Sequence, residues 1–322
     1  MRSITRKACW AATACAAVFS AACNRTPGKT IGVVPKGSSH IFWQAVHAGS
    51  IKAARECGYR IVWNAPAQEG DRSRQIAIVE SLINQGVVGI ALAPNDRAAL
   101  SAVVERATAA GIPVAIFDSA IDTPRHIGFV GTNNREGGRV AARRLGELIG
   151  GRGLVAMISD TPGSASTAER IEGFSSQMRV QYPGVRLLGP EFCEASRAKA
   201  RAVAENLLSA HPDLAAIFAD HENAISGTVL AVKARERRSV KLVGFDASEP
   251  LANDMKEGWI DSLVIQDPFR MGYESVRIID LKLKGGSPPS EIDTGVTLVR
   301  ASDLGRPEIR DLLFPKIDAY LR

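Results

Sequence analysis

From residue 30 onward, the sequence alternates short apolar runs rich in β-branched residues with longer stretches of helical periodicity. The apolar runs lie at 30–34, 60–63, 89–92, 114–117 and 126–130, and then at 154–159, 185–188, 216–219 and 241–244. Helical patterns lie at 44–57, 72–85, 97–110, 136–149, 166–181, 198–210 and 225–234. Runs that are apolar throughout are typical of parallel strands covered on both faces. The alternation therefore predicts right-handed βαβ units and an α/β fold.

The rhythm comes in two blocks of similar size, the second starting at Asn134. Several helical patterns end at a glycine (Gly58, Gly86 and Gly111), which suits a left-handed helix cap. No low-complexity linker separates the blocks. We therefore expect two doubly wound parallel-sheet lobes joined by short hinge segments.

The first residues do not share this pattern. A basic start, an Ala-rich apolar stretch at 8–19 and small residues before Cys23 predict a secretory signal over 1–22, too short for a membrane span. Cys23 and the polar tether after it resemble a bacterial lipoprotein lipobox, so Cys23 is expected to be the lipidated mature N-terminus. Ser20 stands where that motif usually has an aliphatic residue, which leaves ordinary signal peptidase cleavage open.

The charge balance does not favour a nucleic-acid partner. Residues 1–22 carry three positive charges and no acid, so without them the formal charge falls from +6 to +3. No dense Lys/Arg patch is interleaved with aromatic residues. The cysteines left after the signal, Cys57 and Cys193, could pair, but are expected to be two buried free thiols.

Polar residues follow the predicted strands, and ligands of open α/β sheets bind at the carboxyl ends of the strands. Such strand ends include Ser38-Ser39-His40, Asn95-Asp96, Asp118-Ser119, Asp160, Asp220-His221-Glu222-Asn223, Asp246 and Gln266-Asp267. These side chains form hydrogen bonds and do not resemble a phosphate cradle. They predict a polar ligand site at the carboxyl ends of the strands.

Six stretches resemble, in order, the ribose-binding branch of the type I periplasmic binding proteins. They are IPVAIFDS (112–119), GTNNREGGRVAA (131–142), GSASTAERIEGF (163–174), NLLSAHPDLAAIFADHENAISG (206–227), VGFDAS (243–248) and VIQDPFRMGYESV (264–276). The resemblance spans nearly all of residues 30–300. The family comprises exported solute receptors that hand sugars to ABC importers, and the same two lobes recur in LacI-type repressors.

The resemblance implies how the chain divides. The N-terminal lobe would comprise 30–132 plus 267–292, and the C-terminal lobe 133–266 plus 293–322. Three hinge segments would join them, near 131–135, 264–268 and 290–295. Ligand would favour closure of the two lobes about this hinge.

By matching motif, the resemblance also implies the sugar contacts. They are His40, Phe42, Trp43, Asn95, Asp118, Arg170, His221, Asp246 and Gln266. The residue types suit a sugar, because carboxylates accept hydroxyl protons, Arg170 offers a fork of donors, and aromatic rings cover C–H faces. Which of Phe42 and Trp43 faces the ligand stays open.

Other kinds of site lack their motifs. No zinc-type spacing joins His40 and His47 to Cys or carboxylate partners. The sequence has no complete phosphate loop, no G-x-G-x-x-G after the first strand and no G-x-S-x-G elbow. We therefore expect no enzyme activity and no cofactor.

The resemblance implies a periplasmic or cell-envelope receptor, expected to be a monomer, that delivers a monosaccharide or polyol to an ABC transporter permease. Its membrane contact would be the N-terminal lipid alone. An alternative is a receptor for a sugar-like signalling molecule of the autoinducer-2 type, feeding a chemoreceptor or sensor kinase. An α/β sugar-processing enzyme is a further alternative, whereas a LacI-type regulator would need a DNA-binding segment where the export signal stands.

Overall fold

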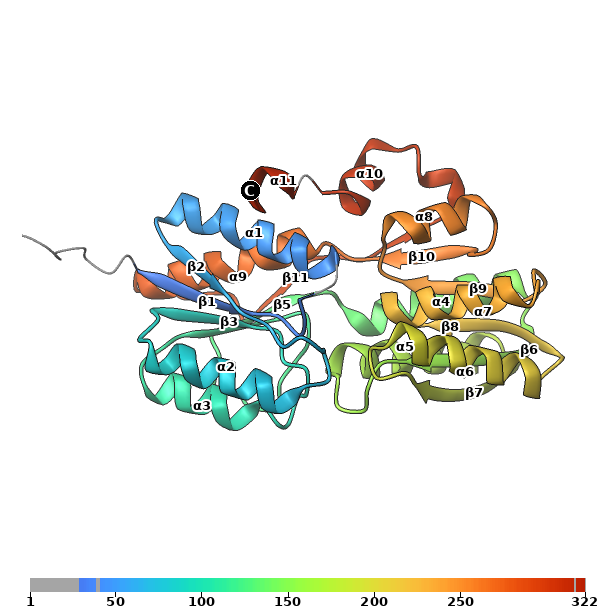
Figure 1. Ribbon diagram of the computed structural model, residues 1–322, viewed down its shortest axis with the longest axis horizontal. Helices are drawn as coiled ribbons and strands as arrows, with labels where there is room; N and C mark the ends of the chain where they lie inside the picture. The colour runs from blue at the N-terminus through green and yellow to red at the C-terminus, as the bar shows by residue number, and fades with distance from the viewer. Residues whose placement is uncertain (1–28, 39–40, 316, 322) are drawn as a thin grey trace, which may run out of the picture.

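The computed structural model describes residues 29–38, 41–315 and 317–321. The expected signal segment, the lipidation site Cys23 and the expected ligand contact His40 lie outside these residues. Within them, two α/β lobes stand side by side along the long axis of the molecule (Figure 1). The prediction of two doubly wound lobes is confirmed.

Six strands form the sheet of the first lobe, in the order β11-β5-β4-β3-β1-β2. They are β1 (Thr30–Val34), β2 (Arg60–Trp63), β3 (Gly89–Leu92), β4 (Val114–Phe117), β5 (Gly128–Gly131) and β11 (Glu291–Asp293). All neighbours in this sheet pair in parallel.

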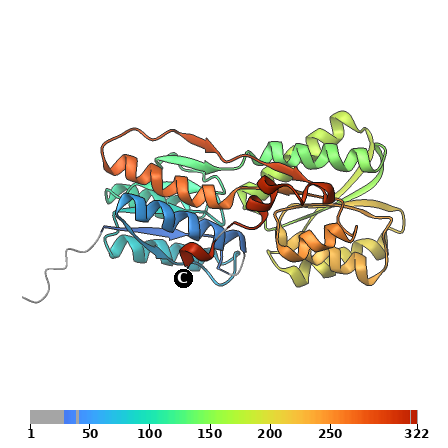
Figure 2. The ribbon, with the colours of Figure 1, turned by 90° about the horizontal axis from the view of Figure 1, so that it is seen from above.

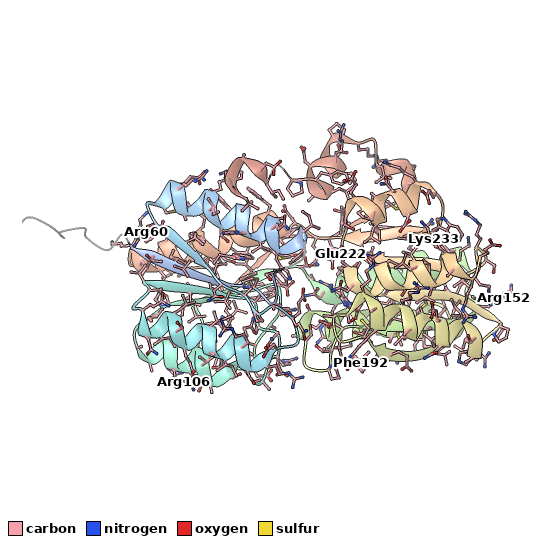
Figure 3. The ribbon with its side chains drawn as sticks, viewed as in Figure 1. Arg60, Arg106, Arg152, Phe192, Glu222 and Lys233 are labelled. Carbon is pink, nitrogen blue, oxygen red and sulfur yellow. The ribbon has the colours of Figure 1, made fainter. Side chains whose placement is uncertain are left out.

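The second sheet repeats this arrangement, in the order β12-β10-β9-β8-β6-β7. Its strands are β6 (Arg152–Ser159), β7 (Gly184–Phe192), β8 (Leu214–Ala219), β9 (Lys241–Phe245), β10 (Ser262–Ile265) and β12 (Thr297–Val299). Only β12 pairs antiparallel to its neighbour, β10, among the strands described. β6 starts at Arg152, at the outer end of the molecule, and runs toward the first lobe (Figure 3).

Helices cover both faces of each sheet. In the first lobe α1 (Ile41–Cys57) and α9 (Pro268–Leu283) share one apolar cluster with the sheet, and α2 (Arg72–Asn84) and α3 (Ser101–Ala109) share the other. In the second lobe one apolar cluster contains side chains of two helices and the other those of four. The first pair is α4 and α5, and the other four are α6, α7, α8 and α10. These helices are α4 (Asn134–Leu148), α5 (Ala165–Gln181), α6 (Arg197–Ala210), α7 (Glu222–Ala234), α8 (Glu249–Lys256) and α10 (Pro307–Leu313).

Two helix pairs pack with their backbones in close approach, one pair in each lobe. A Cβ on Gly272 of α9 would lie 2.0 Å from the carbonyl oxygen of Val46 in α1. A Cβ on Gly138 of α4 would lie 2.1 Å from the carbonyl oxygen of Arg170 in α5. Real Cβ atoms do not come so close to backbone, so both helix pairs depend on glycine at these positions.

Local polar groups fix several helix starts. The carboxylate of Asp96 accepts the backbone N–H groups of Ala98 and Ala99, at 3.0 and 2.9 Å. These bonds hold a turn, so α3 begins at Ser101 and not at 97 as expected from its periodicity. Asn133 and Asp267 cap α4 and α9 with their side chains, directly after the chain crosses between the lobes.

The chain crosses between the sheets three times, after β5, after β10 and between β11 and β12. The first two crossings lie at 131–134 and 265–268, and the third at 293–297, slightly later than expected. Crossing segments one and three are bonded together, since the N–H of Thr294 donates to Gly131 O at 2.8 Å and the Thr132 hydroxyl to Gly295 O at 3.2 Å.

The last residues pass over the hinge. After the short 3-10 helix η1 (Ala301–Asp303), α10 packs on the second lobe, but α11 (Asp318–Leu321) lies on α1 of the first (Figures 1 and 2). The Tyr320 ring lies 5.7 Å from that of Phe269, and Arg55 lies over it. The expected assignment of 293–322 to the C-terminal lobe is therefore wrong for this last helix.

In the described part of the chain, no helix is long and apolar enough to cross a membrane. Cys57 and Cys193 are free thiols, as expected. Cys193 is buried, whereas Cys57 is only half-buried, because it lies at the end of α1 next to the Arg277 guanidinium.

Candidate functional site

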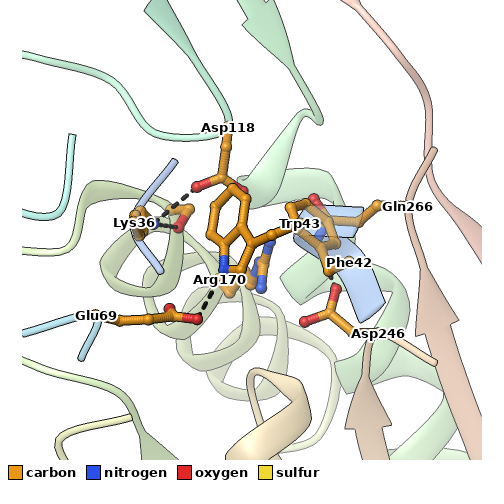
Figure 4. A pocket seen from close by; sticks show the side chains of 9 residues that line it. Lys36, Phe42, Trp43, Glu69, Asp118, Arg170, Asp246 and Gln266 are labelled. Carbon is orange, nitrogen blue, oxygen red and sulfur yellow. Dashed lines mark hydrogen bonds and ion pairs between the residues drawn. The ribbon is translucent and has the colours of Figure 1, made fainter. Parts of the chain in front are cut away.

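A cleft lies between the lobes, where the carboxyl ends of both sheets face each other (Figure 4). About 360 Å³ of space not filled by protein atoms, open solvent included, lies between its lining residues. Its lining residues are Lys36, Phe42, Trp43, Glu69, Asp118, Ser166, Arg170, Asp246 and Gln266. The structure thus brings together six of the nine residues expected from the sequence.

Asp246 and Gln266 form one side of the cleft. The Gln266 Nε2 donates to Asp246 Oδ1 at 2.6 Å, and the other carboxylate oxygen accepts the N–H of Glu222, in the first turn of α7, at 3.3 Å. The Gln266 Oε1 is buried and accepts no hydrogen bond. A buried acceptor without a donor is costly, so this oxygen is placed to take a hydrogen bond from a ligand.

Asp118 lies across the cleft and is paired with a lysine that the sequence reasoning missed. Lys36, only 4% exposed, places its Nζ 2.8 Å from Asp118 Oδ2. The same ammonium group donates to the hydroxyl of Ser119 at 2.6 Å and to that of Ser166 at 3.1 Å. Lys36 stands two residues beyond the end of β1, so its position at a strand end was the signal that could have identified it.

Arg170 is buried at the base of the cleft, 2% exposed. Its Nε donates to Asn134 Oδ1 and its Nη1 to the carbonyl oxygen of Asp220, both at 2.8 Å. The guanidinium carbon lies 3.9 Å from the centre of the Phe245 ring. Arg170 is therefore held in place by the second lobe, and does not pair with a neighbouring Glu on the helix surface.

The two adjacent aromatic residues differ in their surroundings. Trp43 is 3% exposed and belongs to the core of the first lobe, with its indole Nε1 donating to Glu69 Oε1 at 2.8 Å. Phe42 is half-buried, packs edge-on against Trp43 at 4.8 Å, and also lines an apolar hollow beneath the C-terminal segment. Both rings therefore border the cleft, but Phe42 is the less enclosed.

Glu69 is a second lining residue that the sequence did not indicate. It lies in the loop between β2 and α2, far from any strand end, so only the fold brings it to the cleft. Asn95 holds this loop, because its Nδ2 donates to the Glu69 carbonyl oxygen at 2.9 Å. Asn95 is not among the residues that line the cleft, but its own Oδ1 is buried without a hydrogen-bond partner, and its direct contact with a ligand stays a prediction.

His221 also does not line the cleft. Its Nδ1 lies 2.9 Å from Asp220 Oδ1 and its Nε2 lies 3.8 Å from the Cys193 sulfur. Both ring nitrogens thus have partners inside the second lobe, and the direct contact expected of His221 stays a prediction.

The environment of His221 favours its charged form. Burial alone would lower the pKa of this imidazole, but its hydrogen bonds to Asp220 and Cys193 and the nearby charge of Asp160 outweigh burial and raise the pKa well above its usual range. Burial raises the pKa of the Asp220 carboxyl, although the hydrogen bonds that it accepts from His221 and Ser159 lower it in part. The Asp160 Oδ1 is buried and accepts no hydrogen bond.

Chemically, the cleft suits an uncharged ligand rich in hydroxyl groups. Its cations already have protein partners, whereas Gln266 keeps a free acceptor. The carboxylates of Asp118 and Asp246 can accept hydroxyl protons, and the Phe42 and Trp43 rings offer flat apolar area. No group of three or more His, Cys, Asp or Glu in the described residues could hold a metal ion.

The fold and this cleft together define a bilobal solute receptor. A model of the periplasmic binding protein domain matches residues 31–287. The chain therefore belongs to the periplasmic binding protein family, as a type I member of its ribose and monosaccharide branch. The resemblance found in the sequence is confirmed.

Curated relatives share most of the chain. The ribose import binding protein of Bacillus subtilis (strain 168) is 28% identical over 256 residues, covering 80% of this chain and 82% of that protein. The D-ribose/D-allose-binding protein of Pseudomonas aeruginosa is 30% identical over 305 residues, covering 90% and 95%.

Solved structures of similar proteins superpose over nearly their whole length. A carbohydrate transporter solute-binding protein from Agrobacterium radiobacter, in complex with D-arabinose, gives a TM-score of 0.86 at 28% identity, covering 89% of this chain and 99% of that one. An ABC transporter solute-binding protein from Agrobacterium vitis, with bound D-fucose, gives 0.86 at 29% identity, covering 88% and 100%.

Proposed function

We propose that this protein is an exported solute-binding protein that captures a monosaccharide, either a pentose, a hexose or a polyol, and delivers it to an ABC importer. The observation that carries the proposal is the interlobe cleft, where Asp118 and Asp246 face each other beside Arg170 and two aromatic rings. Relatives that bind ribose, and similar structures with bound arabinose or fucose, support it.

Within the cleft we assign polar contacts to Asp118, Arg170, Asp246 and Gln266, and the apolar contact to Phe42 and Trp43. Hydrogen bonds with a charged partner contribute about 1.5–3 kcal/mol each, so the three charged residues should dominate the polar part of the affinity. His40 remains a proposed contact, since it lies just before α1. Asn95 and His221 also remain proposed contacts, and Asn95 in addition holds the loop of Glu69.

The proposed mechanism is a population shift and involves no covalent chemistry. A ligand that contacts Asp118 in one lobe and Asp246 in the other binds only the closed form with full strength, so it favours closure about the three crossing segments. A membrane permease would then recognise the closed form. A chemoreceptor or sensor kinase would read the same closed surface.

We also propose the cellular setting. The N-terminal pattern supports export to the periplasm with lipid on Cys23, and the periplasmic family supports the same compartment. We further propose that the protein acts as a monomer, with 30–132 plus 267–292 and 133–266 plus 293–315 as its two lobes.

A thermal-shift screen against pentoses, hexoses and polyols tests the function. A ligand present at about 100 times its Kd adds roughly 2.7 kcal/mol of stability, which a melting curve resolves. We expect at least one monosaccharide to raise the melting temperature. Failure of every sugar and polyol to do so would count against the proposed function, and product formation would indicate an enzyme instead.

A further inference from the structure

Five buried side chains form one polar network at the edge of the cleft, and they come from both lobes. Lys36, Asp118 and Ser119 belong to the first lobe, and Ser164 and Ser166 to the start of α5 in the second. Each is at most 4% exposed. A lysine buried to this degree needs partners for its charge, and here part of the partner set lies across the lobe boundary.

Lys36 is the centre of this network. Its ammonium group lies 2.8 Å from Asp118 Oδ2 within its own lobe, and 3.1 and 3.4 Å from the hydroxyl oxygens of Ser166 and Ser164 in the other lobe. The Ser119 hydroxyl oxygen accepts from Lys36 at 2.6 Å and from the backbone N–H of Ser166 at 3.2 Å. The lobes are thus bonded together at Lys36 by protein atoms alone.

We propose that Lys36 is a positioning residue that holds the two lobes closed and orients Asp118 for the ligand. The effect on ligand binding rests on the proposed function, whereas closure of the lobes by Lys36 requires no ligand. Asp118 Oδ2 is engaged by Lys36, so the lysine fixes the rotation of the carboxylate. Because the same ammonium group reaches Ser164 and Ser166, closure and orientation of Asp118 are coupled.

A simpler role for Lys36 would be to neutralise Asp118 within the first lobe. The serines separate the two roles, because neutralisation requires only Asp118, whereas closure requires the hydroxyl groups across the boundary. Ser164 is the N-cap residue of α5 but makes no side-chain capping bond, so its hydroxyl can be removed without loss of a cap. In a Ser166→Ala variant the backbone N–H bond to Ser119 is retained.

The test compares four proteins: wild type, Lys36→Met, the double variant Ser164→Ala/Ser166→Ala, and the control Lys199→Met. Lys199 pairs with Glu194 on the exposed surface of the second lobe. Protection of the backbone amide of residue 166 from hydrogen exchange, relative to the intrinsic rate of each sequence, reports closure in ligand-free protein. Calorimetric titration with the sugar found in the screen reports affinity. Thermal melting confirms that each variant is folded.

We expect Ser166 to exchange about 10-fold faster or more in Lys36→Met, because charged hydrogen bonds across the boundary are lost, and sugar affinity to fall by a similar factor. The double serine variant should change both quantities in the same direction, about 3-fold or more, while Lys199→Met leaves them unchanged. Equal Ser166 exchange in wild type and Lys36→Met would overturn the proposal. An unchanged double serine variant would also overturn it, by leaving neutralisation as the only role of Lys36.

These outcomes are distinct from failure of the proposed function. If no sugar binds the wild type, the function fails, but Ser166 exchange in the ligand-free proteins still decides whether Lys36 holds the lobes together. If a sugar binds and exchange does not respond to Lys36→Met, the function stands and the role of Lys36 is refuted.

Discussion

Asp118 and Asp246 occupy equivalent positions in the two lobes. Asp118 follows the buried Phe117 at the end of β4, and Asp246 follows the buried Phe245 at the end of β9. Both adopt a left-handed backbone, with φ of 61° and 68°, and the N–H of each donates to a carbonyl oxygen of the neighbouring strand. Such a conformation is uncommon for a residue with a side chain. The repeat of this strained turn points one carboxylate from each lobe into the same cleft.

Replacing the aromatic residues separately should distinguish their roles. Phe42→Ala should weaken sugar binding by about 1 kcal/mol or more, because the half-buried ring borders the cleft, with little effect on folding. Trp43→Ala removes a core side chain and should lower the free energy of unfolding by about 3–5 kcal/mol. Titration calorimetry and urea unfolding of both variants measure this difference. Equal loss of stability in the two variants would contradict it.

Arg170 should matter for both binding and stability. Arg170→Met leaves Asn134 Oδ1 and the Asp220 carbonyl oxygen without their donor and removes the contact with Phe245. We expect the free energy of unfolding to fall by about 2 kcal/mol or more and sugar affinity to be lost. Arg179→Met, in the last turn of the same helix, is the control. A variant with wild-type stability would show that Arg170 is not held as described.

The alternation of strands and helices in both lobes could be predicted from the sequence. Strands buried on both faces are apolar throughout, and several of the helices between them end at a glycine. The sequence also predicted four residues that line the cleft: Asp118, Asp246 and Gln266 directly follow strands, and Arg170, inside α5, was indicated by the family motif around it. Glu69 could not be found in this way, since a loop within the first lobe carries it to the cleft. The position of α11 depends on contacts of Tyr320 with the opposite lobe, which periodicity does not encode.

The close helix pairs make a strong prediction about stability. Gly272→Ala places a methyl group where the Val46 carbonyl oxygen lies, so α1 and α9 must separate. We expect a loss of about 1–3 kcal/mol or more in the free energy of unfolding. Gly305→Ala is the matched control, because a Cβ there meets nothing within 4 Å. Similar unfolding midpoints for the two variants would disprove the close approach.

His221 should make stability depend on pH. The pKa of its imidazole is raised in the folded protein, so its contribution is fully present below the unfolded value, about 6.5, and is lost as the pH rises through the folded value. The stability difference between wild type and His221→Gln should therefore shrink as the pH rises from about 6, below the unfolded pKa, to about 9. Burial lowers the pKa of His47 and His126, but both proteins share this effect. Denaturant unfolding across this range measures the difference, and a difference that grows with pH would refute the assignment.

The central claim is that a sugar binds between Asp118 and Asp246, and titration calorimetry of the double variant Asp118→Asn/Asp246→Asn tests it most directly. The control is Asp213→Asn, an exposed carboxylate paired with Arg186 on the second lobe. We predict that wild type and control bind one equivalent of the sugar, whereas the double variant, still folded, loses affinity by about 100-fold or more. Equal affinity in the folded double variant would contradict the account.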